Sequence, residues 1–373
     1  MTMQFAKHPP IPHVEEKIIL VLQGGGALGS YQAGAFEALA NACYDPEWIA
    51  GISIGSINAA IIAGNPPQQR LEKLKQFWQL VSANVTLSPV VNNNMGRKIF
   101  NEYSAFVTAM QGVEGFFRPR MPSPFNLSPV SYYDTSPLRD TLLKFVDFDY
   151  LNACHVRLSI GAVNVETGNF AYFDSLTDTI CPEHIMASGA LPPGFPPVEI
   201  DGQWYWDGGL VSNTPLQYVI DNMKNDQDSC IFQVDLYSAS GPMPQTLLDV
   251  EQRESDIRYS SRTRLNTSYF KKVQQMRRTL QRLIEKLPED IKSDPDWQAL
   301  NEWSSDAAIT VVHLINRRKE YQTNSKDYEF SRYSMQEHWS SGKGDVEHTL
   351  NHPQWLEREK PKHGVRVLDL CNK

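Results

Sequence analysis

The chain has 373 residues, enough to bury one large hydrophobic core or two smaller ones. Hydrophobic residues make up 41% of it and charged residues 21%, which is typical of a globular protein and excludes a collagen-like or disordered composition. The formal net charge of -8 argues against a nucleic-acid binder, because phosphate contacts need a basic surface.

Five cysteines are scattered along the chain without a CxxC pair or a matching set of histidines: Cys43, Cys154, Cys181, Cys230 and Cys371. This odd set predicts reduced thiols rather than a disulfide framework, and no metal or cofactor is implied. Residues 1–17 lack the apolar stretch of a signal peptide, and the apolar run 18–22 is too short to cross a bilayer. We therefore expect a cytoplasmic protein.

The first elements alternate between strands and helices. The apolar run 17–22 ends in a glycine cluster, which indicates a buried parallel strand. A helix is expected over 30–42, a short strand over 48–50 and a second helix over 54–63. This order is the opening of a doubly wound α/β domain.

The rest of the chain divides near residue 240. Before it, strands are expected at 156–163 and 231–236, and the Pro-, Asn- and Ser-rich segment 89–137 is expected to form loops and a cap. After it, the sequence predicts a long charged helix at 245–287, a polar linker at 288–296, a strand at 309–315 and a helix at 328–340. We predict two domains, residues 17–240 and a mainly helical C-terminal extension over 245–373.

The central motif is Gly51-Ile52-Ser53-Ile54-Gly55, between a predicted strand and a predicted helix. A sharp strand-to-helix turn exposes a serine for nucleophilic attack, and the flanking glycines permit the strained backbone. The alternative is a glycine-lined turn whose serine only caps the helix.

A second motif, Gly24-Gly25-Gly26-Ala27-Leu28-Gly29, lies at the preceding strand-to-helix junction. Its spacing satisfies the GxGxxG dinucleotide fingerprint, but the next strand ends in the serine motif instead of the acidic residue that a dinucleotide site needs. The glycine loop has a second use, as an oxyanion hole whose N–H groups face an ester bound to Ser53. Neighbouring parallel strands would bring both loops to one sheet edge.

The third motif is Trp206-Asp207-Gly208-Gly209, where a carboxylate on a tight turn can point into a cleft. By itself Asp-Gly is most simply a hairpin turn. Its value comes from the other motifs, because a serine hydrolase still needs a base. An α/β-hydrolase places its histidine after the serine and the aspartate. The histidines in that position, which stay open as alternatives, are His338, His348, His352 and His363.

Together the three motifs resemble the patatin-like phospholipases over roughly residues 17–240. The segment Ala187-Ser188-Gly189-Ala190-Leu191-Pro192 also resembles the family, and residues 326–332 resemble a C-terminal domain of unknown function found in bacterial members. The resemblance implies a three-layer α/β/α sandwich with a mostly parallel sheet. It also implies a Ser-Asp dyad, with Ser53 as nucleophile, Asp207 as general base, and Gly24, Gly25 and Gly26 as the oxyanion hole. The family usually carries a lysine or arginine where this chain has Leu28.

The segment 251–286 is basic, with ten Lys or Arg against four Asp or Glu. Apolar residues recur in it at helical spacing: Leu265, Tyr269, Val273, Met276, Leu280, Leu283 and Leu287. This pattern fits a helix with one face on the core, an attraction to anionic lipid, or a helix for self-association. We expect a lipid acyl hydrolase in peripheral contact with anionic membrane. The alternatives are a carboxylesterase for smaller or storage-type esters and a non-catalytic module that binds membrane or protein.

Overall fold

The computed structural model describes residues 16–91, 93–120, 130–223, 227–261, 263–317, 319, 321–359, 361 and 364–371. The expectations for residues 1–15 and for His363 lie outside these residues. Within the described ranges, no helix combines the length and the apolarity that a membrane span requires.

A central sheet of nine described strands runs through the molecule, in the order β11-β10-β9-β1-β2-β5-β8-β7 with β6 paired to β5. Neighbours from β11 to β5 are parallel, and β6, β8 and β7 run antiparallel to their partners. The strands of this sheet are β1 (Lys17–Leu22), β2 (Trp48–Ile52), β5 (Arg157–Asn164), β6 (Phe170–Asp174), β7 (Val198–Ile200), β8 (Gln203–Asp207), β9 (Ser229–Asp235), β10 (Ile309–Ile315) and β11 (Val365–Leu368). β3 (Arg118–Pro119) and β4 (Tyr133–Asp134) form a separate pair.

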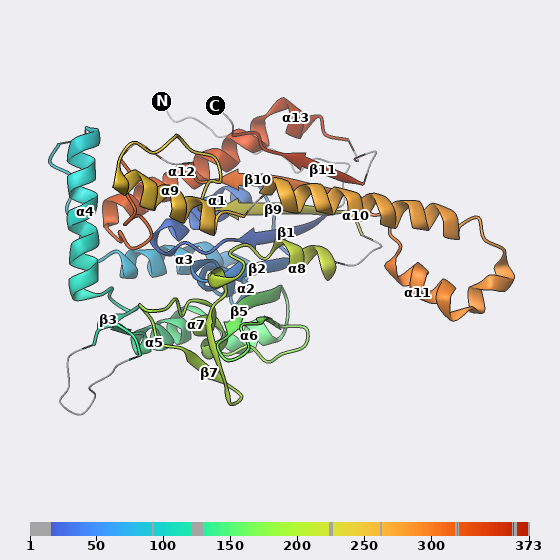
Figure 1. Ribbon diagram of the computed structural model, residues 1–373, viewed down its shortest axis with the longest axis horizontal. Helices are drawn as coiled ribbons and strands as arrows, with labels where there is room; N and C mark the ends of the chain where they lie inside the picture. The colour runs from blue at the N-terminus through green and yellow to red at the C-terminus, as the bar shows by residue number, and fades with distance from the viewer. Residues whose placement is uncertain are drawn as a thin grey trace.

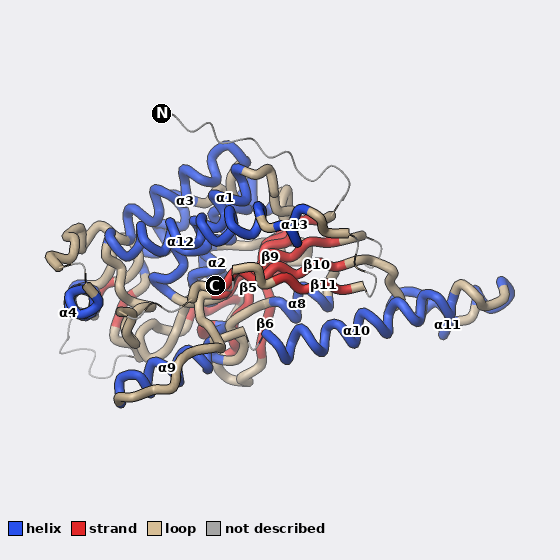
Figure 2. The backbone as a smooth tube through the Cα atoms, turned by 90° about the horizontal axis from the view of Figure 1, so that it is seen from above, coloured by secondary structure: helices blue, strands red, loops and turns tan. Residues whose placement is uncertain are grey.

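Thirteen helices accompany the sheet in the described part of the chain: α1 (Ser30–Asn41), α2 (Ile54–Ala63), α3 (Pro67–Val81), α4 (Asn94–Gln111), α5 (Ser136–Phe145), α6 (Phe148–Asn152), α7 (Pro182–Ser188), α8 (Leu216–Asp221), α9 (Leu247–Tyr259), α10 (Thr263–Ile284), α11 (Pro295–Trp303), α12 (Arg332–Asn351) and α13 (Pro353–Leu356). Helices α1, α3 and α12 cover one face of the sheet, and α8 and α10 lie on the other (Figure 2). The predicted α/β/α sandwich with a mostly parallel sheet is confirmed.

The pattern of β1 shows why its sequence is continuously apolar. Leu20 and Leu22 belong to the core between the sheet and the α1 layer, whereas Ile19 and Val21 belong to the core under α8 and α10. A parallel strand with helices on both faces has no solvated side, so every position favours an apolar residue.

The structure adds detail to two expectations about helices. Residues 94–111, expected within loops and a cap, form the helix α4, whose N-terminus is capped by Asn93 accepting from the Gly96 amide at 2.8 Å. The charged helical segment expected over 245–287 is divided into two helices, α9 and α10. Helices α10 and α11 extend away from the body at one end of the molecule, while α4 lies at the other end in both views (Figures 1 and 2).

The C-terminal residues complete the sheet and one helical layer. Strands β10 and β11 extend it beyond β9, so the expected division at residues 240–245 falls between adjacent strands of one sheet. Helix α12 crosses α1 closely: a Cβ at Gly34 would lie 1.9 Å from the Trp339 carbonyl, and one at Gly342 would lie 2.0 Å from the Tyr31 carbonyl. The Tyr31 hydroxyl also donates to Asp345 at 2.6 Å.

Candidate active site

Ser53 lies between β2 and α2 with φ 54° and ψ -125°, in a region that residues other than glycine rarely adopt. The turn has no room for a side chain at either of the nearby glycines, Gly51 and Gly55. A Cβ at Gly51 would lie 2.5 Å from the Gly55 carbonyl, and one at Gly55 would lie 2.4 Å from the Leu22 carbonyl. The strained turn places the serine at the carboxyl end of β2 and at the N-terminus of a helix.

The backbone of this turn is held by a second serine. The Ser53 amide donates to the Ser188 hydroxyl at 2.9 Å, and that hydroxyl donates to the Gly161 carbonyl at 2.7 Å. Ser188 is fully buried. It therefore connects the turn to β5 and α7, a role that its sequence context does not reveal.

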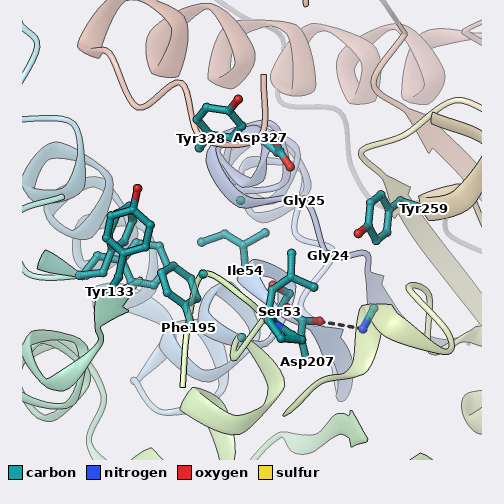
Figure 3. A pocket seen from close by; sticks show the side chains of 18 of the residues that line it. Gly24, Gly25, Ser53, Ile54, Tyr133, Phe195, Asp207, Tyr259, Asp327 and Tyr328 are labelled. Carbon is teal, nitrogen blue, oxygen red and sulfur yellow. Dashed lines mark hydrogen bonds between the residues drawn. The ribbon is translucent and has the colours of Figure 1, made fainter. Parts of the chain in front are cut away.

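Asp207 ends β8 and is brought beside Ser53 because β8 pairs with β5, the neighbour of β2 (Figure 3). Its Oδ1 accepts from the Gly209 amide at 2.7 Å. Burial raises the pKa of Asp207 to about 7, while hydrogen bonds from the Gly209 amide and the Ser53 side chain act to lower it. A carboxyl group with this pKa can both take up and release a proton near neutral pH.

The glycine loop approaches Ser53 closely. A Cβ at Gly24 would lie 3.0 Å from the Ser53 Cβ and 2.4 Å from Oδ1 of Asn213. The Gly24 amide donates to the Asn213 carbonyl at 3.2 Å and is therefore already paired. For the Gly25 and Gly26 amides, no acceptor is found among the described residues.

The far end of this loop is held by the C-terminal part of the chain. The Ala27 amide donates to the Asp327 carbonyl at 2.7 Å. Gly26 has φ +53°, and a Cβ on it would lie 2.0 Å from the same carbonyl oxygen. Leu28 is fully buried in the core and is not among the described residues that line the cavity at this loop.

These groups share one cavity of about 570 Å³. Among its described lining residues are Ser53, Asp207 and the three glycines, and none is a histidine, lysine or arginine. One wall is aromatic and comprises Phe116, Phe117, Tyr133, Phe195 and Phe330, whose rings contact one another. Figure 3 shows Tyr133 and Phe195 on one side of Ser53 and Tyr259 on the other. The described residues contain no group of three metal-ligating side chains.

Residues 20–220 match the patatin-like phospholipase family, which is more than half of the chain. The chain belongs to this family. Residues 257–362 match a second family, DUF3734, described as patatin phospholipase. No curated protein matches the chain. A structural match was found to the crystal structure of VipD from Legionella pneumophila, with a TM-score of 0.40 and 12% identity, covering 92% of this chain and 67% of that one.

In this patatin-like chain, all five residues predicted for the site, Ser53, Asp207, Gly24, Gly25 and Gly26, line one cavity. Three further residues at the site were not predicted. Ser188 holds the serine turn, and Asn213 bridges the Gly24 and Tyr259 carbonyls with its side-chain amide at 3.1 and 2.8 Å. Asp327 lines the cavity from the C-terminal part of the chain, about 270 residues beyond Ser53 in sequence.

Proposed function

We propose that the protein is a serine lipid acyl hydrolase that cleaves fatty acyl esters through an acyl-serine intermediate. The observation that carries the proposal is the strained Ser53 beside the buried Asp207, in a cavity with an aromatic wall that the Gly25 and Gly26 amides border. A nucleophile, a base and unpaired donors around an apolar space are what acyl transfer requires.

In the proposed reaction, the Ser53 hydroxyl attacks the ester carbonyl carbon and its proton passes to Asp207. The Gly25 and Gly26 amides stabilise the oxyanion of the tetrahedral intermediate, while Gly24 contributes by letting the loop approach the serine. The C–O bond then breaks and Asp207 returns the proton to the leaving alcohol. Water, deprotonated by Asp207, hydrolyses the acyl-serine and restores both groups.

A Ser-Asp pair is favoured over a triad by where the described histidines lie. None of them lines the cavity. His338, one of the histidines open as a base, is buried elsewhere, and burial lowers its pKa to about 4. Because no described histidine lines the cavity, we infer that the raised pKa of Asp207 supplies the basicity that a histidine provides in a triad.

The aromatic wall is proposed to take the acyl chain, since its rings offer apolar surface and few polar partners. A preference for long acyl chains in a series of esters would support a lipid substrate. A flat or inverted preference would favour the carboxylesterase alternative.

The test of this function is the variant Ser53→Ala. We expect it to lose hydrolysis of a p-nitrophenyl acyl ester and labelling by a fluorophosphonate probe, with an unchanged circular dichroism spectrum. Ser212→Ala, which removes an exposed serine from the loop after Asp207, is the control and should keep both. Labelling and turnover that persist in a folded Ser53→Ala protein would overturn Ser53 as the nucleophile. A wild type that shows neither would favour the non-catalytic alternative.

Peripheral contact with anionic membrane is part of the proposal. On α10, Tyr269, Met276 and Leu283 are exposed and share one face at seven-residue spacing, and Lys271 and Lys272 of the same helix are exposed as well. Two other basic residues of α10 have partners within the protein. Arg277 is buried over the Trp303 ring, and Arg278 pairs with Asp306 at 2.7 Å.

A further inference from the structure

A second carboxylate, that of Asp327, faces the cavity opposite the catalytic pair. Figure 3 shows it above Gly25, across the cavity from Asp207. The residue lies in the segment before α12, and its carbonyl already anchors the Ala27 amide. Because the backbone alone provides that anchor, the acidic side chain is not needed for it.

The neighbours of Asp327 do not use its full capacity as an acceptor. The Tyr237 hydroxyl and nearby backbone amides act on it as donors, yet Oδ1 is buried and has no partner among the described residues. The adjacent Lys326 forms a buried ion pair with Asp256 instead. An ionised carboxylate offers about four acceptor sites, and Asp327 lines the cavity as a partly exposed residue, so its side chain can accept a further hydrogen bond there.

The buried position of the Asp327 carboxyl group makes its ionised side chain unfavourable unless it gains a further partner. Burial raises the pKa of Asp327 to about 6, which means that its ionised form is destabilised where it stands. Buried polar groups with unused acceptor capacity are uncommon in folded proteins and ask for an explanation. A donor on a bound substrate would satisfy the carboxylate.

The glycine loop connects Ser53 to the backbone of Asp327. Gly24 is packed against the Ser53 side chain at one end of the loop, and Gly26 is packed against the Asp327 carbonyl at the other. The backbone between these two glycines spans at most about 7 Å. The loop therefore keeps Asp327 near the serine turn, and both residues line the same cavity.

We propose that Asp327 accepts a hydrogen bond from a hydroxyl on the alcohol part of the bound ester, so that the site selects neutral esters with a free hydroxyl close to the scissile bond. This inference rests on the proposed hydrolase function. A phosphate in the same place would meet a carboxylate, with no lysine or arginine among the described lining residues to offset the repulsion.

The test compares three decanoate esters: 2-hydroxyethyl, propyl and 2-phosphoethyl. The first two have the same number of heavy atoms and differ only in a terminal hydroxyl or methyl group. We expect the wild type to prefer the hydroxyethyl ester over the propyl ester in kcat/KM by about 10- to 100-fold, the value of one hydrogen bond to a charged acceptor. The phosphoethyl ester should be the poorest of the three.

Variants separate the side chain from the rest of the site. In Asp327→Ala, the preference for the hydroxyethyl ester should fall to about one. Asp327→Asn keeps the shape and one acceptor oxygen and should give an intermediate preference. Asp235→Asn is the matched control, because Asp235 is also a buried carboxylate with a pKa raised to about 6 by burial, but it lies outside the cavity lining. Its preference should equal that of the wild type.

Different results would overturn the role of Asp327 and the proposed hydrolase function. Equal rates for the hydroxyethyl and propyl esters in the wild type, a preference for the phosphoethyl ester, or an unchanged preference in Asp327→Ala would overturn the role of Asp327. Hydrolysis of all three esters by Ser53→Ala would overturn the proposed function itself.

Discussion

Asp207 combines the two properties that a lone carboxylate base needs, a fixed position and a high proton affinity. If it is the base, only its ionised form is active. We expect kcat/KM for a soluble ester to rise about tenfold per pH unit below the pKa of about 7 and to level off above it. A pH series from 4.5 to 9 measures this. A profile that levels off near pH 4, the ordinary range of an aspartate, would show that a group other than Asp207 controls the rate.

The variant Asp207→Asn tests activity and stability together. We expect a loss of rate on the order of 10³ or more, because an amide cannot accept the serine proton. The folded-state pKa lies above the unfolded value of about 4, so ionisation destabilises the fold increasingly as the pH rises from about 4 to 7. The variant lacks this penalty and should unfold at a higher temperature than the wild type at pH 8. At pH 4 the advantage should vanish, and thermal melts at the two pH values give the comparison.

Among single residues, the sequence predicts the site residues that stand in a recognisable local motif. Ser53 stands between required glycines, and Asp207 precedes two glycines. The segments around Ser188 and Asp327 resemble the family, but no local pattern assigns a role to either side chain. Their roles depend on β5, α7 and the C-terminal segment arriving at the same place, which only the fold determines.

At the element scale, helices α1 and α12 cross so closely that there is no room for a side chain at Gly34 or Gly342. Gly342→Ala should separate the two helices, because its Cβ would lie 2.0 Å from the Tyr31 carbonyl, and we expect a loss of about 1–3 kcal/mol or more of unfolding free energy. Gly344→Ala is the control on the same helix, with nothing within 4 Å of the added carbon. It should be neutral or stabilise by up to about 1 kcal/mol. Denaturant titrations of both variants measure the difference, and equal stabilities would refute this view of the crossing.

Two helices compete as the lipid-contacting element. On α4, Met95, Ile99, Tyr103, Phe106 and Met110 are exposed along one face, and the same helix lines the cavity through Thr108 and Ala109. The exposed face of α10 is instead at the other end of the molecule (Figure 1). We expect α4 to contribute the apolar contact near the cavity and α10 a salt-sensitive attraction.

The comparison uses one double variant for each helix. Ile99→Ser with Phe106→Ser should weaken binding to both neutral and anionic vesicles, because it removes apolar contact. Lys271→Gln with Lys272→Gln should weaken binding to anionic vesicles only, and more at low salt, at about 1 kcal/mol per charge. Co-sedimentation across a salt series distinguishes them. If both variants bind vesicles as well as the wild type does, neither helix contributes to lipid contact.

Strand and helix limits were predicted best where the pattern is purely local. The predicted limits of β1, α2 and β10 coincide with those observed. Helix α4 was missed because its flanks are rich in Pro, Asn and Ser, and because its apolar stripe faces outward rather than onto a core. The break between α9 and α10 was missed because charged residues continue across it without a proline or glycine.

For the whole molecule, the shared sheet bears on whether the family-typical part folds by itself. Residues 1–240 alone would expose the edge of β9, the glycine face of α1 and an unanchored glycine loop. We expect this fragment to aggregate and to lack hydrolase activity. The control is a variant in which a short Gly-Ser linker replaces only residues 283–302. The linker can be short because the two ends of the deletion are close together: the Ser304 hydroxyl donates to the Gln281 side chain at 2.5 Å. We expect this variant to stay active. An active, monomeric 1–240 fragment would contradict the expectation.

The hydrogen bond from the Ala27 amide to the Asp327 carbonyl also determines when the glycine loop can be held in place during synthesis. A ribosome releases Gly24, Ser53 and Asp207 long before it reaches residue 327. Until then the glycine loop lacks the acceptor that holds its far end, and β9 lacks its outer neighbour. If Ser53 and Asp207 act as proposed, the nascent chain carries them in a latent form, and we expect reactivity toward esters to begin only after residue 327 has been synthesised. A stalled chain ending at residue 320 should resist a fluorophosphonate probe that labels the 373-residue chain.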